Sequence, residues 1–190
     1  MIDKKQKNIK PKDRRPSSEE AKKCPLTSYC WPLMGMGLAA FVLILDQISK
    51  WVVLNHLMVP PQKLVVTSFF NIVLTWNRGV SFGLFSNTSV YGPWLLAAIA
   101  FGFIAVIIFW VWQAETKIMA LAFGSVLGGA IGNLLDRLRF GAVTDFLDFH
   151  AFGYHWYAFN IADAAIVIGV ALILFQYLKE LWSENKKQLP

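Results

Sequence analysis

The chain has 190 residues, of which 56% are hydrophobic and 16% charged, and its formal net charge is +6. A soluble domain of this size is less apolar, so the composition excludes an ordinary soluble protein and predicts a membrane protein. Half of the eighteen Lys and Arg residues lie among the first thirty residues. The positive charge is therefore a property of one tail and does not indicate a nucleic-acid-binding protein.

The N-terminal segment, residues 1–30, combines these basic residues with Pro and Ser and has almost no apolar side chains. Such a segment cannot bury a core, and its Lys and Arg excess favours the cytoplasmic side of a membrane. We expect a disordered cytoplasmic tail whose charges set the topology, with binding to anionic lipids as the alternative. Cys24 and Cys30 have no further Cys to complete a metal site, and we assign them no role.

Four apolar segments follow, at Trp31–Leu54, Trp94–Gln113, Lys117–Arg137 and Ala158–Leu178. Each has about the length of roughly 20 residues that a helix needs to cross a hydrocarbon core of about 30 Å. With a cytoplasmic N-terminus, four crossings make Asn55–Pro93 and Leu138–Tyr157 external and return residues 179–190 to the cytoplasm as a short basic tail. We expect one four-helix membrane domain over residues 31–178, without internal repeats.

The first external connection contains the segment Lys63–Asn77, which is rich in Val, Thr, Phe and Ile. These residues favour strands, and Asn77-Arg78-Gly79 directly after them predicts a turn. We therefore expect a small strand-based platform on the outer surface, within about residues 55–93.

The third span carries Gly124, Gly128 and Gly132 at four-residue spacing, so one stripe of the helix has almost no side chains. Another helix can approach such a stripe closely. We interpret these glycines as packing positions and not as part of a ligand site.

Charged side chains inside a membrane cost about 2.5–3.5 kcal/mol at its centre on insertion scales, so each needs a partner or a function. Asp46 and Lys50 are four residues apart in the first span, which predicts a structural ion pair on one helix face. Asn133 and Arg137 are likewise one turn apart near the outer end of the third span, with Asp136 between them. An amide and a guanidinium directed at one point suit the positioning of a carboxylate or carbonyl group.

Two further acidic residues flank the fourth span. Asp163 follows Asn160 by three residues, a spacing that is also typical of a helix N-cap with an acidic residue in the first turn. Asp145 lies in the second external connection, which is long enough to fold back over the start of the fourth span. The two carboxyl groups then face one another, although each alone has an ordinary structural explanation.

Two carboxyl groups a few Å apart at a partly dry interface do not both ionise near neutral pH, so the pair shares a proton. The ionised member can take a proton from an attacking water while the protonated member donates to the scissile carbonyl oxygen. His56, His150 and His155 lack metal-ligand spacing, so we expect neither a metal nor a cofactor. The residues thus predict an aspartyl peptidase.

Five stretches carry a resemblance to the lipoprotein signal peptidases, the type II signal peptidases of bacteria, across about Phe41 to Tyr177. They are Asp46-Gln47-Ile48-Ser49-Lys50, Asn77-Arg78-Gly79-Val80-Ser81-Phe82-Gly83, the segment from Gly128 to Arg137, Val143-Thr144-Asp145-Phe146, and Phe159-Asn160-Ile161-Ala162-Asp163. The resemblance implies that Asp145 and Asp163 are the catalytic dyad. It also implies a set of residues that line or support the substrate site: Asn133, Arg137, Asn160, Asp46, Asn77, Asp136 and Lys50.

The same resemblance implies a substrate, a location and an architecture. The substrate is a prolipoprotein that is cut before a Cys already modified with diacylglycerol, in contact with membrane lipids, and globomycin-type peptides are the expected inhibitors. The location is the bacterial cytoplasmic (inner) membrane, with the active site near its periplasmic face. The fold is an all-α membrane protein of four transmembrane helices with a small extracytoplasmic β-cradle and a short periplasmic helix in the Lys63–Pro93 region. Asp148 is a rival to Asp145, but only Asp145 matches the motif.

Two other classes of function remain as alternatives. A proton-coupled transporter needs ionisable groups along a path through the membrane, but Ala105–Val111 and Ile166–Leu174 contain none. A non-catalytic membrane scaffold accounts for the glycines and the basic tail, but not for two convergent Asp residues.

Overall fold

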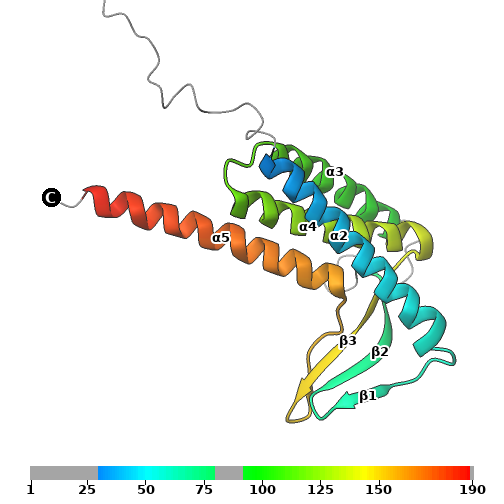
Figure 1. The fold of residues 1–190 in the computed structure, drawn as a ribbon. Helices are drawn as coiled ribbons and strands as arrows, with labels where there is room; N and C mark the ends of the chain where they lie inside the picture. The colour runs from blue at the N-terminus through cyan, green and yellow to red at the C-terminus, as the bar shows by residue number, and fades with distance from the viewer. Residues whose placement is uncertain (1–29, 80–91, 189–190) are drawn as a thin grey trace, which may run out of the picture.

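The computed structural model describes residues 30–79 and 92–188 (Figure 1). In chain order its elements are α2 (Cys30–Val52), the π-helical turn η2 (Val53–Leu57), β1 (Leu64–Thr67), β2 (Phe70–Asn77), α3 (Gly92–Trp112), α4 (Lys117–Phe140), β3 (Val143–Ala151), β4 (Tyr154–His155) and α5 (Ile161–Gln188). The predicted N-terminal tail lies outside the described residues. The expected short external helix does not occur in residues 63–79, and residues 80–91 lie outside the described part.

Among the described residues, four helices are long and apolar enough to cross a membrane: Cys30–Leu57, Trp94–Trp112, Lys117–Phe140 and Ile161–Ser183. The four predicted spans are therefore confirmed, with their ends shifted by a few residues. The largest difference is in α5, which continues to Gln188 through residues that were expected to form a C-terminal tail. Leu, Lys, Glu and Gln are good helix formers, so the helix continues beyond its apolar part.

Helix α4 is the centre of the bundle, because it packs against α2, α3 and α5 and most of its residues are buried. A Cβ atom on Gly128 would lie 2.5 Å from the carbonyl oxygen of Ala39 in α2, and one on Gly129 would collide with the carbonyl oxygen of Ala162 in α5. Backbones this close leave no room for a side chain, so the predicted packing role of the glycine stripe is confirmed.

Local signals explain where α4 begins and ends. The side chain of Thr116 accepts a hydrogen bond from the amide of Met119 at 3.2 Å, which caps the N-terminus. Gly141 follows the last turn with a φ of 69°, a left-handed conformation that glycine adopts without strain. The chain then turns directly into β3, so the end of α4 positions the strand that carries Asp145.

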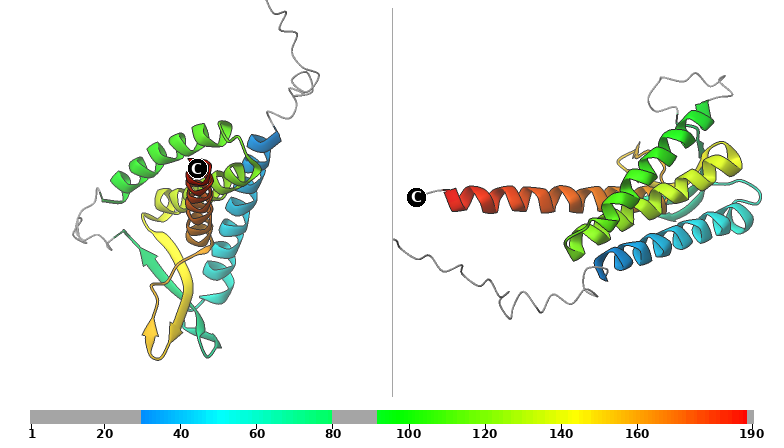
Figure 2. Two further views of the ribbon diagram at one scale, coloured as in Figure 1. Left: turned by 90° about the vertical axis from the view of Figure 1, so that its left-hand side faces the viewer. Right: turned by 90° about the horizontal axis from the view of Figure 1, so that it is seen from above.

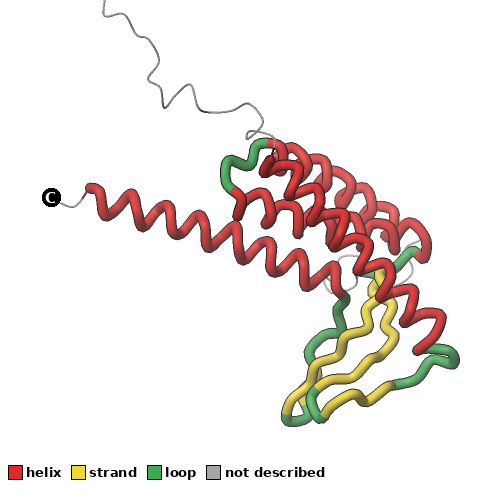
Figure 3. Tube along the Cα trace, viewed as in Figure 1, coloured by secondary structure: helices red, strands yellow, loops and turns green. Residues whose placement is uncertain are grey.

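The strands form an antiparallel sheet in the order β1-β2-β3-β4. It projects from the end of the bundle where α2 ends and α5 begins, and with α5 seen end-on it extends to the side opposite α3 (Figures 2 and 3). Residues Ile72 and Thr75 of β2 pair with Leu147 and Asp145 of β3, so β2 contains one extra residue between these pairs, a β-bulge.

The predicted strand platform over Lys63–Asn77 is confirmed by β1 and β2. The predicted turn is also present, because the Asn77 side-chain oxygen accepts a hydrogen bond from the Gly79 amide at 2.9 Å and Gly79 has a φ of 80°. Strand β3 was not predicted, since residues 143–151 had been interpreted only as part of a connection. The sheet is therefore built from both connections that were expected to be external.

Candidate active site

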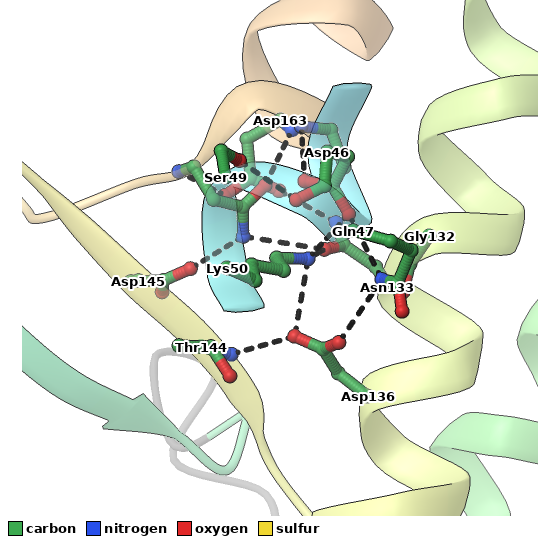
Figure 4. Close-up of polar contacts among 12 residues, drawn as sticks. Asp46, Gln47, Ser49, Lys50, Gly132, Asn133, Asp136, Thr144, Asp145 and Asp163 are labelled. Carbon is green, nitrogen blue, oxygen red and sulfur yellow. Dashed lines mark hydrogen bonds and ion pairs between the residues drawn. The ribbon is translucent and has the colours of Figure 1, made fainter. Parts of the chain in front are cut away.

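Asp145 and Asp163 come from different parts of the fold and meet at one polar cluster (Figure 4). Asp145 lies on β3, and Asp163 lies in the first turn of α5. Asn160, directly before α5, contacts both, because its side-chain amide donates to Asp145 Oδ1 at 2.7 Å while its backbone amide donates to Asp163 Oδ2 at 3.3 Å. One residue thus links the two predicted carboxyl groups.

Asn160 and Asp163 also form a reciprocal helix cap. Asn160 Oδ1 accepts a hydrogen bond from the Asp163 amide at 2.9 Å, and the Asp163 carboxyl group bonds back to the Asn160 amide. The predicted helix cap is therefore confirmed, and the same two residues can still belong to an active site. Because the cap uses one oxygen of Asp163 and Asn133 Nδ2 donates to the other at 2.7 Å, the carboxyl group is held in one orientation.

Asp145 is almost completely buried, with 1% of its surface exposed. Burial raises the pKa of its carboxyl group to about 6, hydrogen bonds from Asn77 and Asn160 oppose the shift, and the nearby charge of Asp163 adds to it. Asp163 is only partly buried. The cluster therefore combines one carboxyl group that retains a proton more readily than usual with a second that is more accessible.

A buried ion network supports this cluster from the side of α2 and α4. Lys50 Nζ lies 2.8 Å from Asp46 Oδ2, as predicted, and also 3.1 Å from Asp136 Oδ2, a partner that the sequence did not reveal. It further donates to Asn133 Oδ1 at 3.2 Å. All three charged side chains are at most 3% exposed, so one lysine neutralises part of the charge of two buried carboxylates.

The two carboxylates of this network hold the backbone next to the predicted dyad. Asp46 Oδ1 accepts a hydrogen bond from the amide of Ala162, the residue before Asp163, at 2.9 Å. Asp136 Oδ2 accepts one from the amide of Thr144, the residue before Asp145, also at 2.9 Å. Because Lys50 joins Asp46 and Asp136, the network connects the backbone positions of the two aspartates.

Gln47 is a site residue that sequence reasoning missed, although it lies inside the first quoted motif. Its side-chain amide donates to Asp46 Oδ2 at 3.2 Å and to Asp136 Oδ1 at 3.3 Å, and its oxygen accepts from Arg139 at 2.9 Å. The signal that could have indicated a site role for Gln47 is its position next to Asp46 in the sequence. The polar amide fills the gap between the two carboxylates and so helps to complete their hydrogen bonding.

Arg137 differs from its expected arrangement. It was expected to point with Asn133 at one position, but its guanidinium donates to the backbone carbonyl of Asn133 at 3.3 Å and lies within 4 Å of no carboxylate in the described residues. Its charge still acts on Asp163 and Asp145 over a longer distance. Asn133 is the side chain that directly contacts Asp163, Asn160 and Lys50.

Asp148, the rival to Asp145, belongs to a different contact set. It is three residues further along β3 and so lies on the opposite face of the strand. Its carboxyl group bonds to Asn71 at 2.8 Å and to His155 at 2.8 Å. Burial alone would raise the pKa of Asp148, but the hydrogen bonds from His155 and Asn71 lower it below its usual value. In the described residues no three His, Cys, Asp or Glu side chains come together as metal ligands.

Comparison with known proteins places the chain in a family. Residues 38–179 match the family described as signal peptidase (SPase) II. The lipoprotein signal peptidase of Methylobacterium sp. (strain 4-46) is 42% identical over 155 residues, which cover 81% of this chain and 92% of that protein. The lipoprotein signal peptidase of Beijerinckia indica subsp. indica is 43% identical over 140 residues, covering 73% and 84%.

The fold resembles that of a solved membrane enzyme. A solved structure described as a bacterial membrane enzyme, determined by the in meso method at 2.3 Å resolution, superposes with a TM-score of 0.69 at 30% sequence identity. The match covers 83% of this chain and 93% of that structure. The chain therefore belongs to the signal peptidase II family of aspartic peptidases and is a multi-pass membrane protein.

Proposed function

We propose that this protein removes the signal peptide from diacylglyceryl-modified prolipoproteins by cleaving before the lipidated Cys, with Asp145 and Asp163 as the catalytic dyad. The observation that carries the proposal is the double contact of Asn160, which bonds to Asp145 through its side chain and to Asp163 through its backbone. This contact supports a fixed relative orientation of two carboxyl groups, which an aspartic mechanism requires.

The reaction begins with a water between the two carboxyl groups. Asp163 accepts a proton from this water, and the water oxygen attacks the scissile carbonyl carbon while Asp145 donates its proton to the carbonyl oxygen. The tetrahedral intermediate then collapses, the C–N bond breaks, and the leaving nitrogen takes the proton from Asp163. The new carboxyl group returns a proton to Asp145. The raised pKa of Asp145, about 6, supports its role as the proton donor.

The lipid on the substrate explains the depth of the site. Asn133 and Asp136 lie near the end of α4, and Asp163 lies near the start of α5, so the cluster is at one end of the membrane spans. A diacylglyceryl group anchors its Cys at the lipid surface, so it delivers the scissile bond to this depth by lateral movement in the bilayer. We assign the site to the periplasmic face of the inner membrane and both termini to the cytoplasm, following the basic residues of the two tails. A globomycin-type peptide would block the same cluster.

The test is cleavage of a diacylglyceryl-modified prolipoprotein by detergent-purified Asp145→Asn and Asp163→Asn enzymes. Each variant should lose more than about 99% of kcat, because general acid–base catalysis contributes typically a factor of 10²–10⁴. Asn is nearly isosteric and keeps an oxygen acceptor, so both proteins should remain folded, which thermal unfolding checks.

Asp148→Asn is the matched control, because this residue is a buried aspartate on the same strand but on its other face. It should retain most of the activity. Normal turnover by either dyad variant, or an inactive but folded Asp148→Asn enzyme, would overturn the assignment. Unmodified prolipoprotein should be a poor substrate for the wild-type enzyme, and equal cleavage of both forms would refute the lipid requirement.

A further inference from the structure

A groove of about 410 Å³ opens at the end of the bundle away from Asp145 and Asp163. Helix α4 forms its floor, and α3 and α5, which both pack on α4, form its walls. Its apolar lining includes Trp110 of α3, Met119 and Phe123 of α4 and Ile173 of α5. The volume lies within the range of sites that hold small ligands or side chains.

The rim of this groove carries oxygen acceptors. Glu115, in the α3–α4 connection, and Glu180, on α5, both line it, and neither forms an ion pair among the described residues. Gln176, which lies behind the lining residues one turn before Glu180, donates to the Glu180 carboxylate at 2.9 Å, and its side-chain oxygen is buried without a hydrogen-bond partner in the described part of the chain. Ile173, Gln176 and Glu180 lie on one face of α5 because of their spacing. The rim therefore suits a cation with several N–H donors.

Basic residues also occur at this end of the molecule, but they do not line the groove. Lys117 begins α4, and Lys179 precedes Glu180 on α5, about 100° around the helix from it. Lys186 lies over the Trp182 ring at 4.3 Å from its centroid. The acidic character is thus local to the groove rim and is not a property of the whole surface.

The distance from the groove to the active site matches the length of the apolar part of a signal peptide. Fourteen residues of α4 separate Met119, in the groove, from Asn133, in the active site, which corresponds to about 21 Å of helix. A signal peptide has a basic n-region followed by an apolar h-region of 7–15 residues before the cleavage site, about 10–22 Å if helical. With the scissile bond at the dyad, its n-region reaches the groove.

We propose that this groove binds the basic n-region of the signal peptide, with Glu115 and Glu180 as partners for its Lys or Arg side chains. The inference rests on the proposed function, because it places the scissile bond at Asp145 and Asp163. The apolar lining contacts the first h-region residues, and the carboxylates at the rim contact the charges. The groove would then bind a part of the substrate that lies about 21 Å from the cleaved bond along the bundle.

The test uses two diacylglyceryl-modified prolipoproteins that differ only in the n-region, which carries two Lys in one and two Glu in the other. In the Glu115→Gln/Glu180→Gln enzyme, KM for the Lys substrate should rise about threefold to tenfold, which lies within the range for the loss of two exposed ion pairs, with kcat unchanged. The Glu115→Lys/Glu180→Lys enzyme should prefer the Glu substrate. This exchange of preference is the decisive result.

Lys179→Glu is the matched control, because it changes charge at the same depth but on another side of α5, and it should shift KM less than twofold. Equal effects of the Glu variants on both substrates would overturn the proposal and indicate a lipid headgroup in the groove. If Lys179→Glu changes KM as much as the Glu115/Glu180 double variants do, the proposal is overturned, because the substrate then responds to the overall surface charge and not to the groove.

The two proposals fail in different ways. If the wild-type enzyme cleaves neither substrate, the proposed function fails. Binding of a fluorescent signal peptide to the wild-type and Glu115→Gln/Glu180→Gln proteins still decides the role of the groove, because it requires no turnover. Equal affinity of the two proteins for the peptide with the Lys n-region would overturn the inference.

Discussion

Lys50→Met is the most informative perturbation of the buried network, because this lysine lies within 3.1 Å of both Asp46 and Asp136 and is only 3% exposed. Its removal leaves two buried carboxylates without their cation. Breaking a buried ion pair by removing one partner costs about 3–5 kcal/mol. For a chain of this size about 1 kcal/mol corresponds to roughly 2–4 °C, so the apparent Tm should fall by roughly 6–20 °C.

Asp46→Asn should cost much less, because Lys50 keeps its contact with Asp136 and the new amide oxygen can still accept the Ala162 amide. Thermal unfolding of purified protein in detergent, followed by tryptophan fluorescence, measures both variants. Lys63→Met is the control, because Lys63 is exposed and should be nearly neutral. If Lys50→Met melts at the wild-type temperature, or at a higher temperature than Asp46→Asn, the reasoning about the shared cation is wrong.

Two further perturbations test burial and packing. The raised pKa of Asp145 means that the native state binds this proton more tightly than the unfolded chain, so stability falls as pH rises from about 4 to about 6. Asp145→Asn should therefore raise the free energy of unfolding at pH 7.5 by up to about 3 kcal/mol, and with it the Tm, but leave the Tm nearly unchanged at pH 4. An equal shift of the Tm at both pH values would contradict the burial argument. Gly128→Ala should lower the Tm, because its Cβ would meet the Ala39 carbonyl, whereas Gly102→Ala, with open space around it, should be neutral or stabilising. Equal Tm values for these two glycine variants would argue against close packing of α2 on α4.

Periodicity and the cost of charge in a membrane were enough to predict the four spans, the glycine packing and the Asp46–Lys50 pair. These features depend on residues that are near one another in sequence, or on the rule that side chains inside the lipid must be apolar or paired. For Asn160, such reasoning predicted one contact and missed another. Its capping role followed from its spacing to Asp163, but its contact with Asp145 depends on the path of β3, which no local pattern describes.

Some of the missed features are contacts between distant segments. Asp136 and Gln47 join the ion network only because α2 and α4 approach closely along the glycines, and the identity of their partners is a property of that packing. Strand β3 was missed because its sequence alternates weakly and most of its first six residues are buried, so it lacks the usual exposed and buried pattern. Arg137 was assigned a contact from its spacing, but its side chain bonds to the backbone of its own helix.

The extra residue in β2 decides which side chain of that strand accompanies Asp145. Since side chains alternate along a strand, continuous pairing from Ile72 and Leu147 would put Trp76 opposite Val143 and turn Asn77 to the other face. The extra residue shifts the pairing of β2 with β3 by one residue, so Asn77 pairs with Val143 and lies on the same face of the sheet as Asp145. The β-bulge thus places an amide instead of an indole beside the Asp145 carboxyl group, and a family member without the bulge would need another hydrogen-bond donor at this position.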